Sequence, residues 1–383
     1  MIQMWPRLNK LSLCLAWLVL IAVGCSWLNK PALSPTQVET VQVIPSLPAQ
    51  ITPDPTKSPG GSERLSADQA TTLSSLELVD DYPLYVMHYH GTYLADITGR
   101  NKLPEVFSSE LPKGYSTGAC NKIPWGCSLF AALGDGNSRL YGRNFDWEYS
   151  PALLLVYEPP DGYASLSIVD IAFLGYTGSQ AQGLLGSTLD QRIGLLDAPG
   201  LPFDGMNERG LVVGMAAVPE GNMQPDPNKP TIGSLGVMRE MLDHAQSVSE
   251  TVRILESYNI DDTGGPPVHY LVADASGQAA LIEFYDGKLI VTTNQQPWHL
   301  ATNFLVASTG SSPEGQCWRY DRLSQALTLA GGRFSVPEAI KLLDSVKQDS
   351  TQWSVVYNMT NVSAAVVIGQ DYAQVYTFEL NQP

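Results

Sequence analysis

Strand-like runs of apolar residues stand before and after a helical middle segment, and this order constrains the fold more than any other feature of the chain. Residues 128–133 and 138–141 flank the tight-turn sequence Gly134-Asp135-Gly136-Asn137, which predicts a hairpin. Further strand-like runs lie at residues 269–273, 279–285, 288–292, 354–359, 364–368 and 374–380. The sequence therefore predicts an α+β fold with layered, mostly antiparallel sheets.

Two segments have the pattern of helices. Between Leu235 and Ser257 the apolar residues recur at helical spacing, which predicts a helix over this stretch. Ser335 and Glu338 form a capping-box pattern, so a second helix is expected to begin there.

The charge balance and the cysteine and histidine content exclude two classes of ligand. The 383 residues include 22 Lys and Arg against 38 Asp and Glu, a formal net charge of −16. A surface this acidic repels phosphate backbones, so we expect no nucleic-acid partner. The five His and five Cys show no zinc-ligand spacing, and the sequence predicts neither a metal nor another cofactor.

The N-terminus has the pattern of an export signal. Arg7 and Lys10 precede an apolar run over residues 11–23, which is long enough for a signal peptide but short for a membrane span. The run ends in Ala22-Val23-Gly24-Cys25, which resembles a bacterial lipobox. We expect a signal peptide at 1–24 and a lipid on Cys25, giving an exported lipoprotein anchored at the outer membrane or cell surface. An ordinary secretory signal and an uncleaved anchor are the alternatives.

The next segment is read as a linker. Residues 25–75 are rich in Pro, Ser and Thr and have little apolar periodicity, which predicts a flexible tether. From residue 76 apolar and aromatic residues return at strand-like density, and the run from Tyr82 to Gly91 is apolar enough to pack on a core.

One cysteine has charged residues at suggestive distances in the sequence. Arg143 and Asp146 follow Cys127 by 16 and 19 residues, separations that a short hairpin would bring back beside the thiol. A guanidinium near a thiol favours the reactive thiolate, and a carboxylate near an amine holds that amine in place. The alternative is that Arg143 and Asp146 form an ordinary ion pair at a hairpin end.

This segment resembles the start of the mature chain in the choloylglycine hydrolase and penicillin V acylase family of N-terminal nucleophile hydrolases, to which acid amidases that cleave N-acylethanolamines are related. The resemblance rests on Cys127-Ser128, on Gly142-Arg143-Asn144-Phe145-Asp146-Trp147, on Gly205-Met206-Asn207-Glu208-Arg209-Gly210-Leu211, on Ala301-Thr302-Asn303-Phe304 and on Arg319-Tyr320. These motifs occur in the family's order and cover about residues 127 to 380.

The resemblance implies a fold and a domain organisation. The fold would be the four-layer αββα sandwich, with the amidase domain at residues 127–383. Self-cleavage between Gly126 and Cys127 would make the cysteine a new N-terminus, and Gly suits this position because it tolerates strained backbone geometry. Residues 76–126 would then be a propeptide or a retained α fragment, and we expect the two fragments to stay associated.

The resemblance also assigns roles within the site. The α-amine of Cys127, whose reference pKa is about 7.7 to 8.0, would take the thiol proton. Asp146 would orient that amine, and Arg143 and Arg319 would stabilise charge around the thiolate. The side-chain amide of Asn303 and a backbone N–H near Ala217 would stabilise the oxyanion. Ala217 departs from the Asn of bile-salt hydrolases and the Tyr of penicillin V acylases, so neither substrate carries over directly.

Together these features predict an exported cysteine amidase that hydrolyses a linear carbon–nitrogen amide bond of a small N-acyl substrate through an S-acyl enzyme. The acyl part could come from a bile acid, a fatty acid, a penicillin or a homoserine lactone, and acyl transfer to another amine is equally compatible. The alternative is a surface lipoprotein that keeps the fold and only binds its ligand.

The remaining cysteines leave a disulfide open. Export permits a bridge between Cys120 and Cys317. A competing bridge between Cys120 and Cys127 would block the predicted nucleophile.

Overall fold

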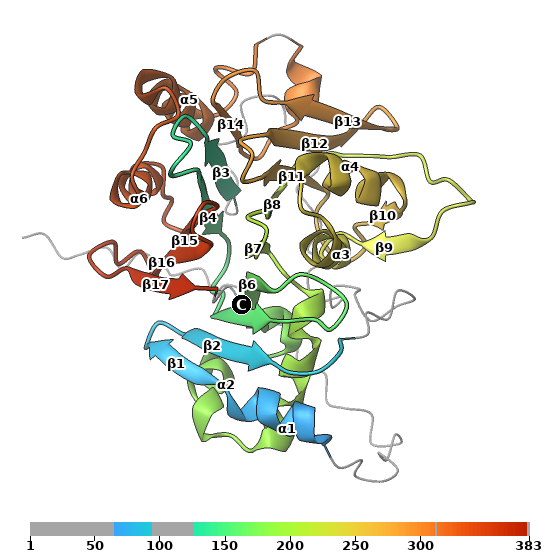
Figure 1. Ribbon diagram of the computed structural model, residues 1–383, viewed down its shortest axis with the longest axis vertical. Coiled ribbons are helices and arrows are strands. Elements are labelled where there is room, and N and C mark those ends of the chain that lie inside the picture. Colours follow the sequence, from blue (N-terminus) through green and yellow to red (C-terminus); the bar gives the residue numbers. More distant parts are fainter. Residues whose placement is uncertain (1–64, 94–125, 311, 381–383) are drawn as a thin grey trace, which may run out of the picture. The chain divides into compact units, whose positions relative to one another are not determined.

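Two β-sheets organise the part of the chain that the structure describes, which comprises residues 65–93, 126–310 and 312–380 of a computed structural model. The nine-stranded sheet has the order β1-β2-β5-β6-β7-β8-β11-β12-β13, and the six-stranded sheet has the order β14-β3-β4-β15-β16-β17 (Figure 1). The strands of the first sheet are β1 (Glu77–Asp80), β2 (Leu84–Tyr89), β5 (Ala152–Tyr157), β6 (Ser165–Asp170), β7 (Asp204–Asn207), β8 (Val212–Ala217), β11 (Val268–Ala273), β12 (Ala279–Tyr285) and β13 (Lys288–Thr293). Those of the second are β3 (Gly126–Ala132), β4 (Leu140–Asp146), β14 (Trp298–Ala301), β15 (Thr351–Asn358), β16 (Ser363–Ile368) and β17 (Tyr376–Glu379), and a separate parallel pair joins β9 (Thr231–Gly233) to β10 (Asn259–Asp261).

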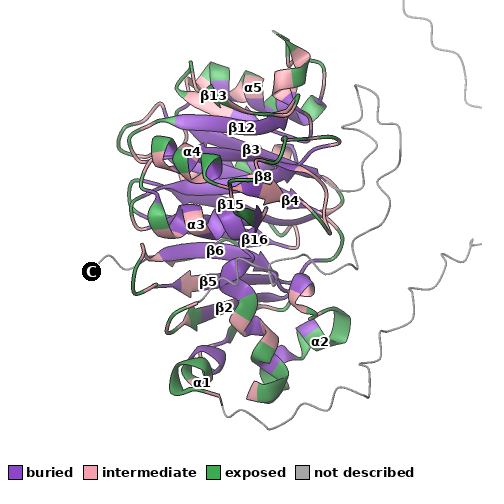
Figure 2. Cartoon of the chain, turned by 90° about the vertical axis from the view of Figure 1, so that its right-hand side faces the viewer, coloured by how far each residue is buried: buried purple, intermediate pink, exposed green. Residues whose placement is uncertain are grey.

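The two large sheets pack face to face through their inner side chains. The Tyr141 hydroxyl of β4 donates to the Leu271 carbonyl of β11 at 2.9 Å. A Cβ added at Gly214 of β8 would lie 2.5 Å from that same hydroxyl oxygen, so glycine there permits the close approach of the sheets. Buried residues fill the central strands of both sheets, whereas β1, β13 and β17 are partly exposed, and the covering helices have both buried and exposed residues (Figure 2).

Helices cover the outer face of each sheet. Those on the six-stranded sheet are α5 (Trp318–Ala330) and α6 (Val336–Ser345), which enclose a second apolar cluster that includes Phe130, Leu323 and Leu343. Those on the nine-stranded sheet are α3 (Gly236–His244) and α4 (Val248–Glu256) (Figure 1). The layers therefore run helix, sheet, sheet, helix, and the predicted αββα sandwich is confirmed.

The hairpin that carries the predicted nucleophile forms as expected. Strands β3 and β4 pair in antiparallel register, with Cys127 opposite Phe145 and Gly126 opposite Asp146. Strand β15 pairs with the other side of β4 and sets Thr351 opposite Asp146. Asp146 is thereby held between two neighbouring strands at one end of the sheet.

The chain before Cys127 takes part in the fold earlier than predicted. Helix α1 (Ala67–Ser74) forms inside the stretch expected to be a tether. A capping box of Ser66 and Gln69 stabilises its first turn, and its Leu73 is fully buried. Regular structure is thus present from Ala67, before the predicted boundary at residue 76. Strand β2 pairs in parallel with β5 and buries Leu84, Tyr85 and Met87 in the core.

The helical middle also differs from the prediction. The single helix expected over 235–257 is two helices, α3 and α4, because Ala245 is extended and Ser247 caps α4 by accepting from the Glu250 N–H. The carbonyls of Leu242 and Ala245, at the end of α3, instead accept from the side-chain amide of Asn207. Helix α6 begins with the predicted Ser335–Glu338 capping box, whereas α5 was not expected from the sequence.

The described chain also contains further short elements. They are η3 (Ile171–Leu174), α2 (Gly178–Gln182), η4 (Leu184–Gly186), η5 (Leu189–Gly200) and η6 (Val306–Thr309). The predicted signal peptide, Cys25, most of the tether and Cys120 lie outside the described residues. Within residues 65–93, 126–310 and 312–380, no helix combines the length and the apolar character that a membrane span needs.

Candidate active site

Cys127 is the second residue of β3 and is a free, buried thiol with 4% of its surface exposed. The Arg143 Nη2 lies 3.6 Å from its Sγ, so the hairpin brings this predicted pair together. Cys317 is disulfide-bonded, whereas Cys127 is not. The alternative bridge between Cys120 and Cys127 is therefore wrong, and the predicted partner of Cys317, Cys120, lies outside the described residues.

Arg143 is held from the opposite sheet by Asp204, the first residue of β7. The Asp204 carboxylate accepts from Arg143 Nη1, from Trp353 Nε1 at 3.2 Å and from the Tyr357 hydroxyl. Arg143 Nη1 also donates to the Phe203 carbonyl at 2.7 Å. Sequence reasoning missed Asp204, although it directly precedes the Gly205-Met206-Asn207-Glu208 motif and that position was the available signal.

The electrostatics of the thiol differ from the expectation of a stabilised thiolate. Burial raises the pKa of the Cys127 thiol, and the nearby Arg143 guanidinium opposes this rise without overcoming it. In the uncleaved chain the thiol is therefore protonated at neutral pH. A base is needed before it can act as a nucleophile.

The backbone of Cys127 is held by two residues from distant parts of the chain. Its N–H donates to Asn303 Oδ1 at 2.7 Å, and Arg319 Nη2 donates to the same oxygen at 2.9 Å. Arg319 Nη1 donates to the Cys127 carbonyl and, at 3.0 Å, to Ser128 Oγ. Arg319 thus fixes both Asn303 and the strand that carries the thiol, a more direct role than charge stabilisation alone.

Asn303 also reaches the predicted Ala217. Its Nδ2 donates to the Ala217 carbonyl at 2.8 Å. The oxyanion role assigned to Asn303 and to a backbone N–H near Ala217 stays a prediction, because in this state the amide of Asn303 is already engaged.

A buried carboxylate anchors the segment that carries Asn303. Glu283 of β12 accepts from the N–H groups of Val306 and Ala307, each at 2.8 Å, and contacts His269 Nδ1 at 3.2 Å. This residue was expected to be structural. Its contacts tie the loop after β14 to the nine-stranded sheet.

Asp146 lies beside the Gly126–Cys127 peptide but is bonded elsewhere in the uncleaved chain. It accepts from the Thr351 hydroxyl and from Gln348 Nε2 at 2.7 Å, and its Oδ2 lies 3.8 Å from Arg319 Nη1. Burial raises the pKa of Asp146, opposed mainly by Arg319. The predicted orientation of the Cys127 amine by Asp146 stays a prediction, and Gln348 and Thr351 are members of the site that the sequence did not reveal.

Gly126 sits in a crowded polar cradle. A Cβ added there would lie 2.6 Å from Gln348 Nε2, 3.0 Å from Arg319 Nη2 and 3.1 Å from Asn303 Oδ1. Contacts this short exclude a side chain unless those polar groups move. The crowding around Gly126 therefore favours glycine before Cys127, in addition to the backbone freedom of this residue.

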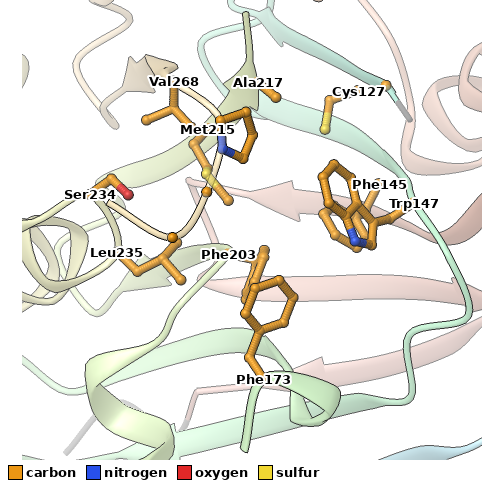
Figure 3. A pocket seen from close by; sticks show the side chains of 14 residues that line it. Cys127, Phe145, Trp147, Phe173, Phe203, Met215, Ala217, Ser234, Leu235 and Val268 are labelled. Atoms are coloured by element: carbon orange, nitrogen blue, oxygen red, sulfur yellow. The ribbon is translucent and has the colours of Figure 1, made fainter. Parts of the chain in front are cut away.

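An apolar pocket begins at the Gly126–Cys127 peptide and extends between the sheet end and the covering loops. About 530 Å³ of its space is free of atoms, part of it open to solvent. Its lining residues come from several elements (Figure 3). They are Phe145 of β4, Trp147 after it, Phe173 of η3, Phe203 before β7, Met215 and Ala217 of β8, Ser234 and Leu235 before α3, the Gly264-Gly265-Pro266 loop, and Val268 of β11. Among the described residues, no charged side chain lines it. Such a site accommodates an apolar acyl group.

The described residues offer no place for a metal ion, since no group of three or more His, Cys, Asp or Glu side chains within them is arranged to bind one.

A comparison with family models identifies one family for part of the chain. Residues 127–315 match the family model of linear amide C-N hydrolases, choloylglycine hydrolase family. Most of the predicted site lies within this match, and Arg319 lies just beyond it. No curated protein matches the chain.

Solved structures also match the chain over part of its length. Penicillin V acylase from Agrobacterium tumefaciens is 17% identical with a TM-score of 0.47, covering 66% of this chain and 86% of its own. Two variants of a conjugated bile acid hydrolase from Clostridium perfringens are 16% and 17% identical, with TM-scores of 0.48 and 0.49. Each covers 66% of this chain and 92% of its own.

Proposed function

Residues 127–315 belong to the linear amide C-N hydrolases of the choloylglycine hydrolase family, and from this premise we propose that the protein is an amidase whose nucleophile is the Cys127 thiol. The observation that carries the proposal is the free thiol itself, 3.6 Å from Arg143 and directly after a glycine enclosed by Gln348, Arg319 and Asn303. A purely structural cysteine would not need a guanidinium beside its sulfur or a crowded polar environment around the preceding residue.

The first reaction is self-cleavage. The Cys127 sulfur attacks the Gly126 carbonyl carbon, the carbon–nitrogen bond between the two residues breaks, and the departing nitrogen takes up the thiol proton. Water then hydrolyses the resulting thioester, releasing a carboxylate on Gly126 and leaving a free thiol and a free α-amine on Cys127. The hydrogen bond from the Cys127 N–H to Asn303 Oδ1, at 2.7 Å, holds the nitrogen during this step.

Cleavage supplies the base that the buried thiol lacks. The α-amine has a reference pKa of about 7.7 to 8.0 and so exchanges a proton near neutral pH. Asp146, beside the new amine, provides an acceptor, and Asn303 Oδ1 provides another. Nucleophile and base are then the same residue.

The second reaction is substrate hydrolysis. The thiolate of Cys127 attacks the substrate's amide carbonyl, the α-amine of Cys127 passes a proton to the leaving amine, and an S-acyl enzyme remains. Water hydrolyses it to the free acid. Arg143 offsets negative charge on the sulfur, while Asn303 and a backbone N–H near Ala217 stabilise the oxyanion, each such donor contributing on the order of 3 kcal/mol.

The substrate we propose is a small N-acyl amide whose acyl part lies in the apolar pocket. The aromatic and aliphatic lining residues favour this orientation, and none of the described residues that line the pocket is charged. The amine part would lie toward solvent.

Export and fragment retention belong to the same proposal. The lipobox-like sequence ending at Cys25 supports an exported, membrane-anchored lipoprotein. The parallel pairing of β2 with β5 and the burial of Leu84, Tyr85 and Met87 support two fragments that stay associated after cleavage.

The test is the intact mass and N-terminal sequence of the purified protein beside a Cys127→Ala variant. We expect a chain that begins at Cys127 in the first and an uncleaved chain in the second. The cleaved protein should then release free acid from at least one member of an N-acyl amide panel, measured by mass spectrometry. Cleavage at Cys127 without any turnover would favour the binding lipoprotein, and an uncleaved native protein would contradict the mechanism.

A further inference from the structure

We infer that the S-acyl site accepts acyl groups with an unbranched α-carbon and rejects those whose α-carbon is quaternary, with Gln348 as the residue that sets this limit. The inference rests on the proposed function, because it uses Gly126 as the molecule's own first substrate.

The two reactions share one covalent intermediate. In self-cleavage the Cys127 sulfur carries the acyl group of Gly126 as a thioester, and in turnover the same sulfur carries the acyl group of the substrate. In both, the atom bonded to the thioester carbonyl carbon is the acyl α-carbon. The Cα of Gly126 therefore marks the region that the substrate's α-carbon occupies.

A substituent on the Gly126 Cα in the direction of an added Cβ would clash with polar side chains. The three polar atoms that surround an added Cβ, at 2.6, 3.0 and 3.1 Å, belong to Gln348, Arg319 and Asn303. A methyl carbon normally needs about 3.5 Å or more from such atoms. An α-carbon with hydrogens can turn its substituents away from this side, but a quaternary α-carbon fills every direction and must place a methyl group there.

Gln348 makes the closest of the three contacts, and it is not free to swing aside. Its Nε2 donates to Asp146 Oδ2 at 2.7 Å. Its backbone N–H donates to Thr351 Oγ1 at 2.9 Å, and its carbonyl accepts from the Thr351 N–H at 3.0 Å. Movement of the amide would break a hydrogen bond to a buried carboxylate, which costs about tenfold or more in an equilibrium.

The next position along the acyl chain meets a different environment. Beyond Gly126 and Cys127 the pocket is lined by apolar groups such as Phe145, Met215 and Ala217, with none of the polar atoms of the cradle. Branching at the β-carbon is therefore tolerated where branching at the α-carbon is not.

The experiment uses the self-cleaved enzyme and the p-nitrophenyl esters of hexanoic, 2,2-dimethylhexanoic and 3,3-dimethylhexanoic acid. The thiolate sulfur forms a bond to the ester carbonyl carbon, the bond to p-nitrophenolate breaks, and water hydrolyses the thioester to the acid. Each kcat/KM is divided by the rate constant of the same ester with free cysteine, which removes intrinsic differences in reactivity. The isomeric dimethyl esters differ only in where they branch.

We expect the corrected kcat/KM of the 2,2-dimethyl ester to fall about tenfold or more below that of the 3,3-dimethyl ester. Gln348→Ala should shrink this ratio, whereas Gln325→Ala, a matched change on the exposed face of α5, should leave it unchanged. Because the readout is a ratio, a general loss of activity through Asp146 does not affect it.

The outcomes separate the two ideas. If hexanoate and the 3,3-dimethyl ester are hydrolysed and the 2,2-dimethyl ester is hydrolysed equally well, the α-carbon inference is overturned and the proposed function stands. If the ratio is large but identical in Gln348→Ala, the assignment of this limit to Gln348 is overturned and the proposed function stands. If no ester reacts faster than with Cys127→Ala, the proposed function is overturned, and the inference with it.

Discussion

The sharpest test of the electrostatic reasoning is Asp204→Asn, which leaves the shape of the side chain nearly unchanged and removes its charge. Asp204 and Arg143 are both fully buried and come from different sheets. The carboxylate accepts from Arg143, Trp353 and Tyr357, so all its partners are themselves buried donors.

The expected loss of stability follows from this geometry. Removing one partner of a buried ion pair typically costs about 3 to 5 kcal/mol, because the remaining charge is uncompensated. Tyr357→Phe removes a single hydrogen bond from the same carboxylate and should cost about 1 to 3 kcal/mol. Urea unfolding of both variants in a Cys127→Ala background, which keeps one uncleaved chain, measures the two values.

Asp204→Asn destabilises the protein but should stabilise the thiolate form of Cys127. Without Asp204, the charge of Arg143 is no longer offset, and its attraction for the Cys127 thiolate increases. The pKa of the Cys127 thiol should therefore fall, although the protein as a whole is less stable. The pH dependence of iodoacetamide alkylation, measured with Cys127 present, reports this shift.

A variant that is as stable as the parent would refute the claim that Asp204 compensates Arg143. A thiol pKa that rises or stays constant would show instead that Arg143 turns away from the sulfur when its partner is lost.

Three further predictions follow from other parts of the structure. Gly126→Ala should slow self-cleavage about tenfold or more, because the added Cβ would meet Gln348. The control Gly136→Ala should cleave at the normal rate, because its Cβ would lie 3.7 Å from the nearest atom, and gel analysis over time compares the two variants. Burial raises the pKa of Asp170 to about 7, so between about pH 4 and pH 7 the folded state binds a proton that the unfolded state releases. Stability should therefore fall as pH rises through this window, by at most about 1.4 kcal/mol per pH unit, and Asp170→Asn should flatten the profile in urea titrations; parallel profiles would contradict this. After self-cleavage the fragment that contains β2 should co-elute with the larger chain in gel filtration and separate only in denaturant, and free elution of an active larger chain would show that the edge strands are dispensable.

Local patterns account for the elements that the sequence predicted well. The β3–β4 hairpin follows from a turn sequence between two apolar runs, and its register brings Arg143 to Cys127 with no information from elsewhere in the chain. The α6 capping box is equally local. The αββα arrangement came from a resemblance, and the structure confirms it.

Elements that depend on tertiary contacts were predicted wrongly or not at all from the sequence. The helical spacing over 235–257 continues across Ala245, but Asn207 of β7 takes up the carbonyls at the end of α3 and Ser247 caps a new helix. Helix α1 looked like part of a linker because its few apolar residues gain their burial only against distant parts of the fold.

The site shows the same division. Residue types, spacings and the family resemblance predicted a site made of a cysteine after a glycine, two arginines, an aspartate and an asparagine. Only the tertiary structure decided that Asp204 holds Arg143, that Gln348 crowds Gly126 and that burial raises the pKa of the Cys127 thiol. The physical reason is that pairing across sheets and burial depend on neighbours far apart in sequence, and desolvation of a thiol depends on everything packed around it.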